Sequence, residues 1–296
     1  MITLRQVNKE LVKPIVIKGI NDNLDKRPIK GAKLIPELYA NIFLLARKKS
    51  GKTVLASKII KECCTRDTTV IVFCSTLDKD PNHKVIKKYC QMQKIPYVGY
   101  TSMYEDGVNI LQELVNKLEE EARLREDAEE EENDENKEQL TRMEKHLMTL
   151  FNSDSEDDED GSHKRKKRNK FQSPQYLIYF DDLSNELKSP ALVTLIKKNR
   201  HFLCKLLISS QYCMDLLPGS LRQIDMCFIF KGVPPEKMQK LIKDFDLAIP
   251  LDKLLNIYQY ATLNKFSFLK IDTQENEYFR NFNFQFDIKE DHNNIE

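Results

Sequence analysis

The sequence lacks most features of a secreted or membrane-bound protein. No apolar run approaches the length of a membrane-spanning helix, and the N-terminal residues show no signal-peptide pattern. The seven cysteines form no C-x-x-C pair, and most of them lie in apolar runs, where a free cysteine behaves as a small hydrophobic residue. We therefore expect a soluble, intracellular protein of a reducing compartment, with no membrane span and no zinc site.

Glycine is also scarce, with 8 in 296 residues, while 31% of the residues are charged. The net charge of +1 conceals an uneven distribution, because residues 119–162 hold 19 Asp and Glu against 5 Lys and Arg. Such a segment buries too little apolar surface to offset its ordering entropy. We predict an N-terminal arm over 1–34, a folded core over 35–118 and 172–288, and a disordered acidic and basic insertion over 119–171.

Residues 164–170 of this insertion are nearly all basic. The tract has the composition of a nuclear-import or nucleic-acid-binding segment, although a solvated charge run is an equal alternative. The remaining chain is modestly basic, which is compatible with a phosphate-backbone partner.

A phosphate-binding loop is predicted where an apolar run from Asn41 meets a Gly-Lys-Thr sequence. The run reads as a buried strand, and a helical pattern follows over 54–63. In this order, loop N–H groups and the helix N-terminus converge on phosphates. Ala46 stands where the first glycine usually lies, and it fits only if its φ stays negative. The candidate nucleotide-binding residues are Ala46, Arg47, Lys48, Lys49, Ser50, Gly51, Lys52 and Thr53.

Two carboxylates at the end of a second strand complete the expected chemistry. The apolar run over 176–180 leads directly into Asp181 and Asp182, in the manner of a Walker B strand. Lys52 is expected to reach the β- and γ-phosphates of ATP, and Thr53 and Asp181 to hold Mg²⁺. Asp182 is the candidate base for the attacking water, and Gln211, at the tip of another strand, is a candidate sensor of the γ-phosphate.

The other patterns indicate alternating strands and helices, as in an α/β fold with a largely parallel sheet. Strands are expected over 68–74, 95–100, 205–211, 226–230, 260–263, 266–271 and 278–284, the last two forming a C-terminal hairpin around 272–276. Helices are expected over 83–93, 110–118, 189–199 and 235–246.

Together these motifs resemble the viral genome-packaging ATPases of the FtsK–HerA superfamily, found in poxviruses, other large DNA viruses, virophages and related mobile elements. The likeness covers about 40–118 and 172–285, without the charged insertion. It rests on these segments: 46–53, 78–81, 180–182, 199–201, 208–212, 217–218 and 221–222.

The resemblance implies a RecA-like P-loop ATPase core in which the strand with the catalytic acid lies beside the phosphate-loop strand. It also implies a homo-oligomeric ring that hydrolyses ATP with Mg²⁺ to pump double-stranded DNA into a capsid or procapsid. Such a protein would act in the host cytoplasm or nucleus at virion assembly sites, or in the virion. In such rings an arginine finger enters from the neighbouring subunit, and Arg222 and Arg200 are the candidates, with Arg222 favoured.

Two departures from the family pattern allow other functions. Ala46 replaces a glycine, and Asp182 stands where many relatives have glutamate, which predicts a slower or partner-dependent ATPase. A small-molecule P-loop kinase is one alternative, although no arginine-rich lid is evident in the sequence. A non-catalytic DNA-binding assembly factor is another, favoured by Ala46 alone.

Overall fold

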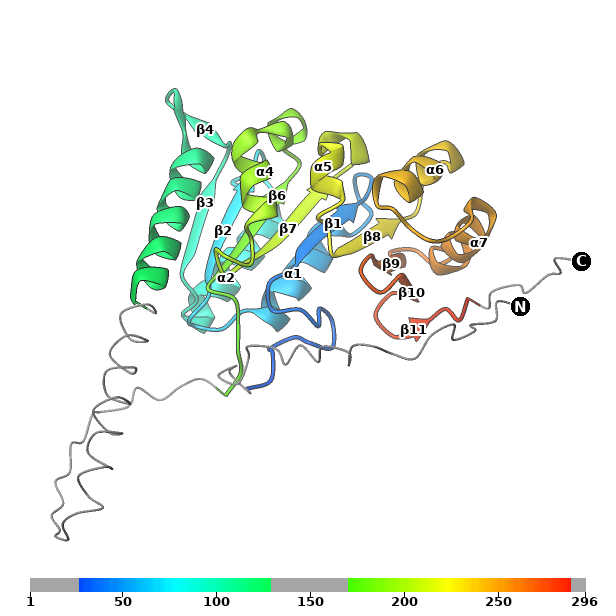
Figure 1. Cartoon of the computed structure of the whole chain (residues 1–296), viewed down its shortest axis with the longest axis horizontal. Helices are drawn as coiled ribbons and strands as arrows, with labels where there is room; N and C mark the ends of the chain where they lie inside the picture. Colours follow the sequence, from blue (N-terminus) through cyan, green and yellow to red (C-terminus); the bar gives the residue numbers. More distant parts are fainter. Residues whose placement is uncertain (1–26, 129–169, 289–296) are drawn as a thin grey trace, which may run out of the picture.

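Six parallel strands form the larger part of a mixed sheet, in the spatial order β3-β2-β6-β7-β1-β8 (Figure 1). The computed structural model describes residues 27–128 and 170–288. Most strand residues are buried, as expected of a parallel sheet covered on both faces. The parallel strands are β1 (Asn41–Leu45), β2 (Thr69–Cys74), β3 (Tyr97–Tyr100), β6 (Tyr176–Asp181), β7 (Cys204–Ser210) and β8 (Met226–Phe230).

Beyond β8 the sheet continues with three antiparallel strands, β9 (Phe268–Asp272), β10 (Glu277–Arg280) and β11 (Phe284–Gln285). The hairpin of β9 and β10 confirms the predicted C-terminal hairpin. A separate two-stranded ribbon pairs β4 (Tyr104–Glu105) with β5 (Val108–Asn109).

Helices cover the two faces of the sheet. Successive residues of β1 alternate between the faces, so that Ile42 and Leu44 pack in one hydrophobic cluster and Phe43 and Leu45 in the other. The first cluster includes α1 (Lys52–Cys63) and α2 (Pro81–Gln93). The second includes a helix over 110–128, α4 (Pro190–Lys197), α5 (Pro218–Leu221), α6 (Pro235–Asp244) and α7 (Leu251–Ala261). Short 3₁₀ helices η1 (Ser184–Lys188) and η2 (Cys213–Asp215) follow β6 and β7.

The helix over 110–128 corrects the predicted start of the insertion. Composition placed that start at residue 119, but the helix continues to 128 and packs on the core through Leu118 and Ala122. Tyr176 Oη donates a hydrogen bond of 2.8 Å to Glu121 on this helix. The other acidic side chains of the helix are exposed, as on the solvent side of an amphipathic helix. The rest of the predicted insertion, 129–169, lies outside the described residues, as do residues 1–26 of the predicted arm.

The strand predicted over 260–263 is also wrong, because residues up to Ala261 belong to α7. Leu254, Tyr258 and Ala261 of α7 are buried at helical spacing, and the aromatic and apolar residues near Tyr260 merely imitate a strand. None of the described helices is long and apolar enough to span a membrane.

The sheet confirms the predicted α/β class, with a phosphate loop after the central strand β1. One implied detail is wrong: β6, which carries the acids, does not lie beside β1, because β7 pairs with both. The strand that leads into Gln211 therefore stands between the phosphate loop and the two carboxylates.

Candidate functional site

The phosphate loop connects β1 to α1 at the carboxyl edge of the parallel strands. Gly51 caps α1 with a φ of 100°, and Lys49 also adopts a left-handed backbone with a φ of 63°. Ala46 is not among the positive-φ residues, which meets the condition set by the sequence, and its N–H donates to Ser210 O at 3.0 Å. The methyl group is thus accommodated where the family pattern has glycine.

Lys52 is the first residue of α1, and its amine lies between the two predicted carboxylates. Its Nζ is 3.1 Å from Asp181 Oδ1 and 3.1 Å from Asp182 Oδ1. Burial lowers the pKa of Lys52, but the two carboxylates outweigh burial and raise the pKa above its usual value. The contact follows from the parallel order, because β1 and β6 end at the same edge of the sheet.

Gln211 follows β7 and joins this group. Its Nε2 donates a hydrogen bond of 2.9 Å to Asp182 Oδ1, the oxygen that faces Lys52. Asp182 has a φ of 57°, an unusual backbone for a residue other than glycine, and this turns it out of β6 toward Gln211. The structure therefore brings the predicted base and the predicted sensor into direct contact.

His83 is a member of this site that the sequence did not single out. It lies on α2, is fully buried, and its Nε2 is 3.0 Å from Asp181 Oδ2. Burial lowers the pKa of His83, but the hydrogen bonds to Asp181 and Cys74 outweigh it and raise the pKa to about 9. In return, His83 and Lys52 overcome the effect of burial on Asp181 and hold the pKa of that carboxyl below its usual range.

The spacing of α2 contained a signal for this histidine. His83, Ile86 and Cys90 recur at intervals of three and four residues and are the buried residues of the helix. A polar side chain in such an apolar stripe needs a buried partner, and Asp181 provides it.

The residues predicted to bind Mg²⁺ fit that ion. Mg²⁺ prefers oxygen ligands, and both Thr53 and Asp181 offer them from buried positions near Lys52. Asp181 Oδ1 is buried and lies on the side of the phosphate loop, where Lys52 Nζ, at 3.1 Å, is its cationic partner. The carboxylate thus presents this oxygen toward the place where phosphate and Mg²⁺ would bind.

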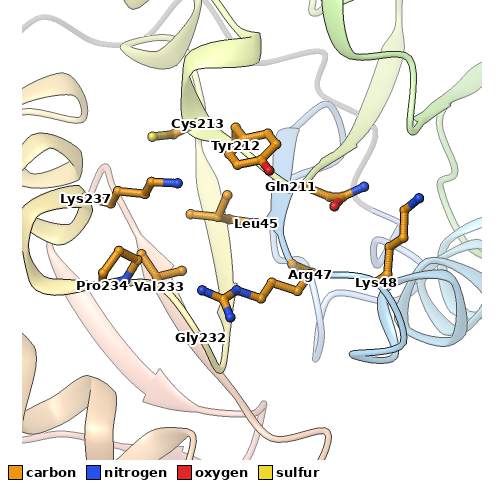
Figure 2. Close-up of a pocket in the computed structure, with 11 residues that line it drawn as sticks. Leu45, Arg47, Lys48, Gln211, Tyr212, Cys213, Gly232, Val233, Pro234 and Lys237 are labelled. Atoms are coloured by element: carbon orange, nitrogen blue, oxygen red, sulfur yellow. The ribbon is translucent and has the colours of Figure 1, made fainter.

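The other basic residues of the loop lie differently. Arg47, Lys48 and Lys49 are exposed. Figure 2 shows Arg47 pointing toward Gly232 and Lys48 pointing to the opposite side, and a Cβ at Gly232 would come within 3.0 Å of the Arg47 side chain. Arg47 and Lys48 border a cavity of about 460 Å³ that is also lined by Gln211 and Tyr212.

Neither candidate arginine-finger residue lies at the carboxyl edge of the sheet, where the phosphate loop is. Arg200 precedes β7, and its guanidinium is 3.3 Å from Glu37 and 3.4 Å from Asp225, which itself accepts from the N–H of Asn41 at the start of β1. Arg222 is exposed at the end of α5, four residues before β8 begins. Both therefore lie toward the amino edge, opposite the phosphate loop of the same chain.

No protein-family model and no curated protein matches the sequence. Among solved structures, the chain is similar to the genome packaging NTPase B204 from Sulfolobus turreted icosahedral virus 2 in complex with AMP, at 16% identity and a TM-score of 0.49, covering 86% of this chain and 100% of that one. It is also similar to B204, the DNA-packaging ATPase from Sulfolobus turreted icosahedral virus, at 15% identity and a TM-score of 0.45, covering 84% and 98%.

A third similar structure is the cytoplasmic domain of the Thermomonospora curvata type VII secretion ATPase EccC. The identity is 12% and the TM-score 0.42, and the match covers 78% of this chain and 24% of that one.

Proposed function

We propose that the chain hydrolyses ATP and uses the energy to move double-stranded DNA into a viral capsid or procapsid. The observation that carries the ATPase proposal is the meeting of Lys52, Asp181, Asp182 and Gln211 beside the phosphate loop. These side chains come from three separate segments and provide a phosphate-binding cation, a metal ligand, a base and a polar amide. The sequence resemblance to genome-packaging ATPases supports the choice of DNA as the translocated substrate.

The contacts suggest an order of events in the site. Phosphate oxygens compete with the carboxylates for Lys52, and transfer of the amine to the β- and γ-phosphates leaves Asp182 as an unpaired carboxylate, able to accept a proton from water. Gln211 then orients Asp182 through their hydrogen bond and senses the γ-phosphate. When bound by Thr53 and Asp181, Mg²⁺ offsets the charge of the phosphate oxygens.

The placement of the arginines supports the proposal of a homo-oligomeric ring. Each strand residue advances about 3.3 Å, so the five residues of β1 separate the two edges of the sheet by about 16 Å. An arginine at the amino edge therefore cannot act on the phosphate loop of its own chain. Both side chains are exposed, but Arg200 is also paired with Glu37 and Asp225, which supports Arg222 as the finger that acts in the neighbouring subunit.

The test is ATP turnover by the full chain with and without linear double-stranded DNA, using Lys52→Met as the control for contaminating ATPases. We expect basal turnover that DNA stimulates, and rings in electron micrographs with an ATP analogue. Phosphate transfer to a small acceptor without stimulation by DNA would favour the kinase alternative. DNA binding without any turnover would favour a non-catalytic assembly factor. In the proposed role the protein acts at assembly sites in the host cytoplasm or nucleus, or in the virion.

A further inference from the structure

A second cavity, of about 560 Å³, opens beside the phosphate loop on the α1 face of the sheet. Its lining is largely aromatic and apolar, with a few polar groups at its border. The lining includes Gly51, Val54, Lys58, Phe266, Phe282 and Asn283. A neighbouring cavity of about 440 Å³ is bordered by residues 47–50 of the phosphate loop and by 264–267, so the two cavities share the loop that carries Phe266.

Phe266 combines two unfavourable features. Its side chain is 56% exposed, and its backbone has a φ of 66°, a strained left-handed conformation for a residue other than glycine. The ring lies directly against the phosphate loop, because a Cβ at Gly51 would be 3.3 Å from Phe266 Cδ1. The contact with Gly51 leaves more than half of the Phe266 side chain exposed beside the cavity, as a planar ligand that stacks on the ring requires.

The catalytic residues define the direction in which a nucleotide extends. Asp182 and Gln211 follow β6 and β7, so the γ-phosphate end points to that side of β1. The strands on the other side of β1 are β8 and β9, and the loop with Phe266 leads into β9. The base end of a nucleotide bound at Lys52 therefore extends toward Phe266.

We propose that the cavity of about 560 Å³ receives the adenine base, with the ring of Phe266 as its stacking platform. The inference rests on the proposed ATPase function and adds to it the residue that holds the base. Lys265 Nζ lies 4.9 Å from the centroid of the Phe266 ring and supports it by a cation–π contact. Tyr212, the exposed aromatic residue next to Gln211, lies on the γ-phosphate side and has Lys237 Nζ 4.6 Å from its ring centroid.

The test compares two ligands by calorimetry on the full chain: ATP, and inorganic tripolyphosphate, which has the phosphates without the base. Stacking of a base on an aromatic side chain contributes about 1–3 kcal/mol, so Phe266→Ala should weaken ATP binding about 5- to 150-fold. Tripolyphosphate affinity should not change, and Phe266→Tyr should keep wild-type affinity for both ligands. The matched control is Leu263→Ala, which removes a 66% exposed apolar side chain three residues earlier.

Three results would overturn the inference while leaving the ATPase proposal intact. The first is unchanged ATP affinity in Phe266→Ala. The second is an equal loss for ATP and tripolyphosphate, which would mean that Phe266 supports the phosphate loop instead of the base. The third is a selective loss of ATP affinity in Tyr212→Ala alone, which would move the base to the cavity of Figure 2. A wild-type protein that binds neither ligand would overturn both proposals.

Discussion

Replacing Lys52 by methionine should change the stability of the fold as well as its activity. The amine lies 3.1 Å from two carboxylates, with exposed side-chain fractions of 10% for Lys52, 4% for Asp181 and 27% for Asp182. Methionine has a similar length but no charge, so both carboxylates lose a cationic partner that solvent cannot fully replace. The variant therefore leaves uncompensated negative charge inside the site.

The loss of unfolding free energy in Lys52→Met can be estimated from the contacts that the two carboxylates keep. Removing one partner of a buried ion pair costs about 3–5 kcal/mol. In the variant, Asp181 keeps the contact of its other oxygen with His83, and Asp182 keeps its hydrogen bond from Gln211 and some contact with solvent. We therefore expect a loss at the lower end of this range, about 3 kcal/mol. For a fold of this size, about 2–4 °C of Tm per kcal/mol gives a decrease of roughly 6–12 °C.

The assay is thermal and urea unfolding without added nucleotide at pH 7. The control is Lys87→Met, which makes the same change at an exposed position of α2 and should leave the Tm within about 1 °C of wild type. The double variant Lys52→Met with Asp182→Asn should recover part of the loss, because one of the two uncompensated charges is gone. Equal Tm values for the Lys52 and Lys87 variants would refute the reasoning.

Four further measurements address the site and the chain around it. Asp182→Asn should bind ATP but lose at least about 100-fold in single-turnover hydrolysis, since it keeps the shape of the side chain without its basicity; wild-type turnover would exclude Asp182 as the base. Arg222→Ala should be inactive alone and regain turnover when mixed with Asp182→Asn protein, whereas recovery with Arg200→Ala instead would assign the finger to that residue. Deleting 129–169, with the helix before it retained, should change the Tm by less than about 2 °C, because loop-closure entropy depends weakly on length; loss of soluble protein would show that the segment packs. Because the pKa of His83 is raised from 6.5 to about 9, its contribution to stability is complete below pH 6.5 and lost as the pH rises through 9, so unfolding across that interval should show a steeper loss in the wild type than in His83→Gln.

The phosphate loop and the two acids were predictable because their signals are local. A strand, a loop and a helix must be adjacent in the chain to bind phosphate, and the Gly-Lys-Thr sequence marks the junction. Parallel strands then bring their carboxyl ends to one edge, so Asp181 and Asp182 could be placed near Lys52 without knowledge of the packing. The roles of these residues stay predictions until the variants are measured.

His83 and Phe266 were not predictable in the same way, since each acts through a contact between distant segments. His83 and Asp181 are in contact although they are 98 positions apart in the sequence. Phe266 and Gly51 are in contact although they come from opposite ends of the folded core in sequence. A lone histidine in a polar helix start and a lone phenylalanine before a strand are common in sequences. The apolar stripe of α2 indicates that His83 is buried, but the packing of α2 on the sheet is needed to show that it meets Asp181. Likewise, the packing of the loop before β9 is needed to show that Phe266 meets the phosphate loop.

Composition misled the prediction at residue 119 for a physical reason. Acidic residues dominate 119–128, but a helix needs only a narrow apolar stripe to pack, and Leu118 and Ala122, four positions apart, continue the stripe of Leu111 and Val115. Hydrogen bonds reinforce the packing, since Arg125 donates to His201 O at 2.9 Å. Average charge over a window thus hides an amphipathic face that the spacing of a few residues reveals.

The position of β7 affects the proposed mechanism, because this strand lies between the phosphate loop and the two carboxylates. Because β7 separates β1 from β6, the distance from the phosphate loop to Asp182 depends on the packing of a third strand whose end carries Gln211. Asp182 N donates to Ser209 O of β7 at 3.4 Å, and Ala46 N donates to Ser210 O of the same strand. The end of β7 thus binds both the loop that holds the phosphates and the residue proposed to activate water. A displacement of β7 would therefore move Gln211 and Asp182 together, so the packing of this one strand sets the distance between the phosphate loop and the proposed base.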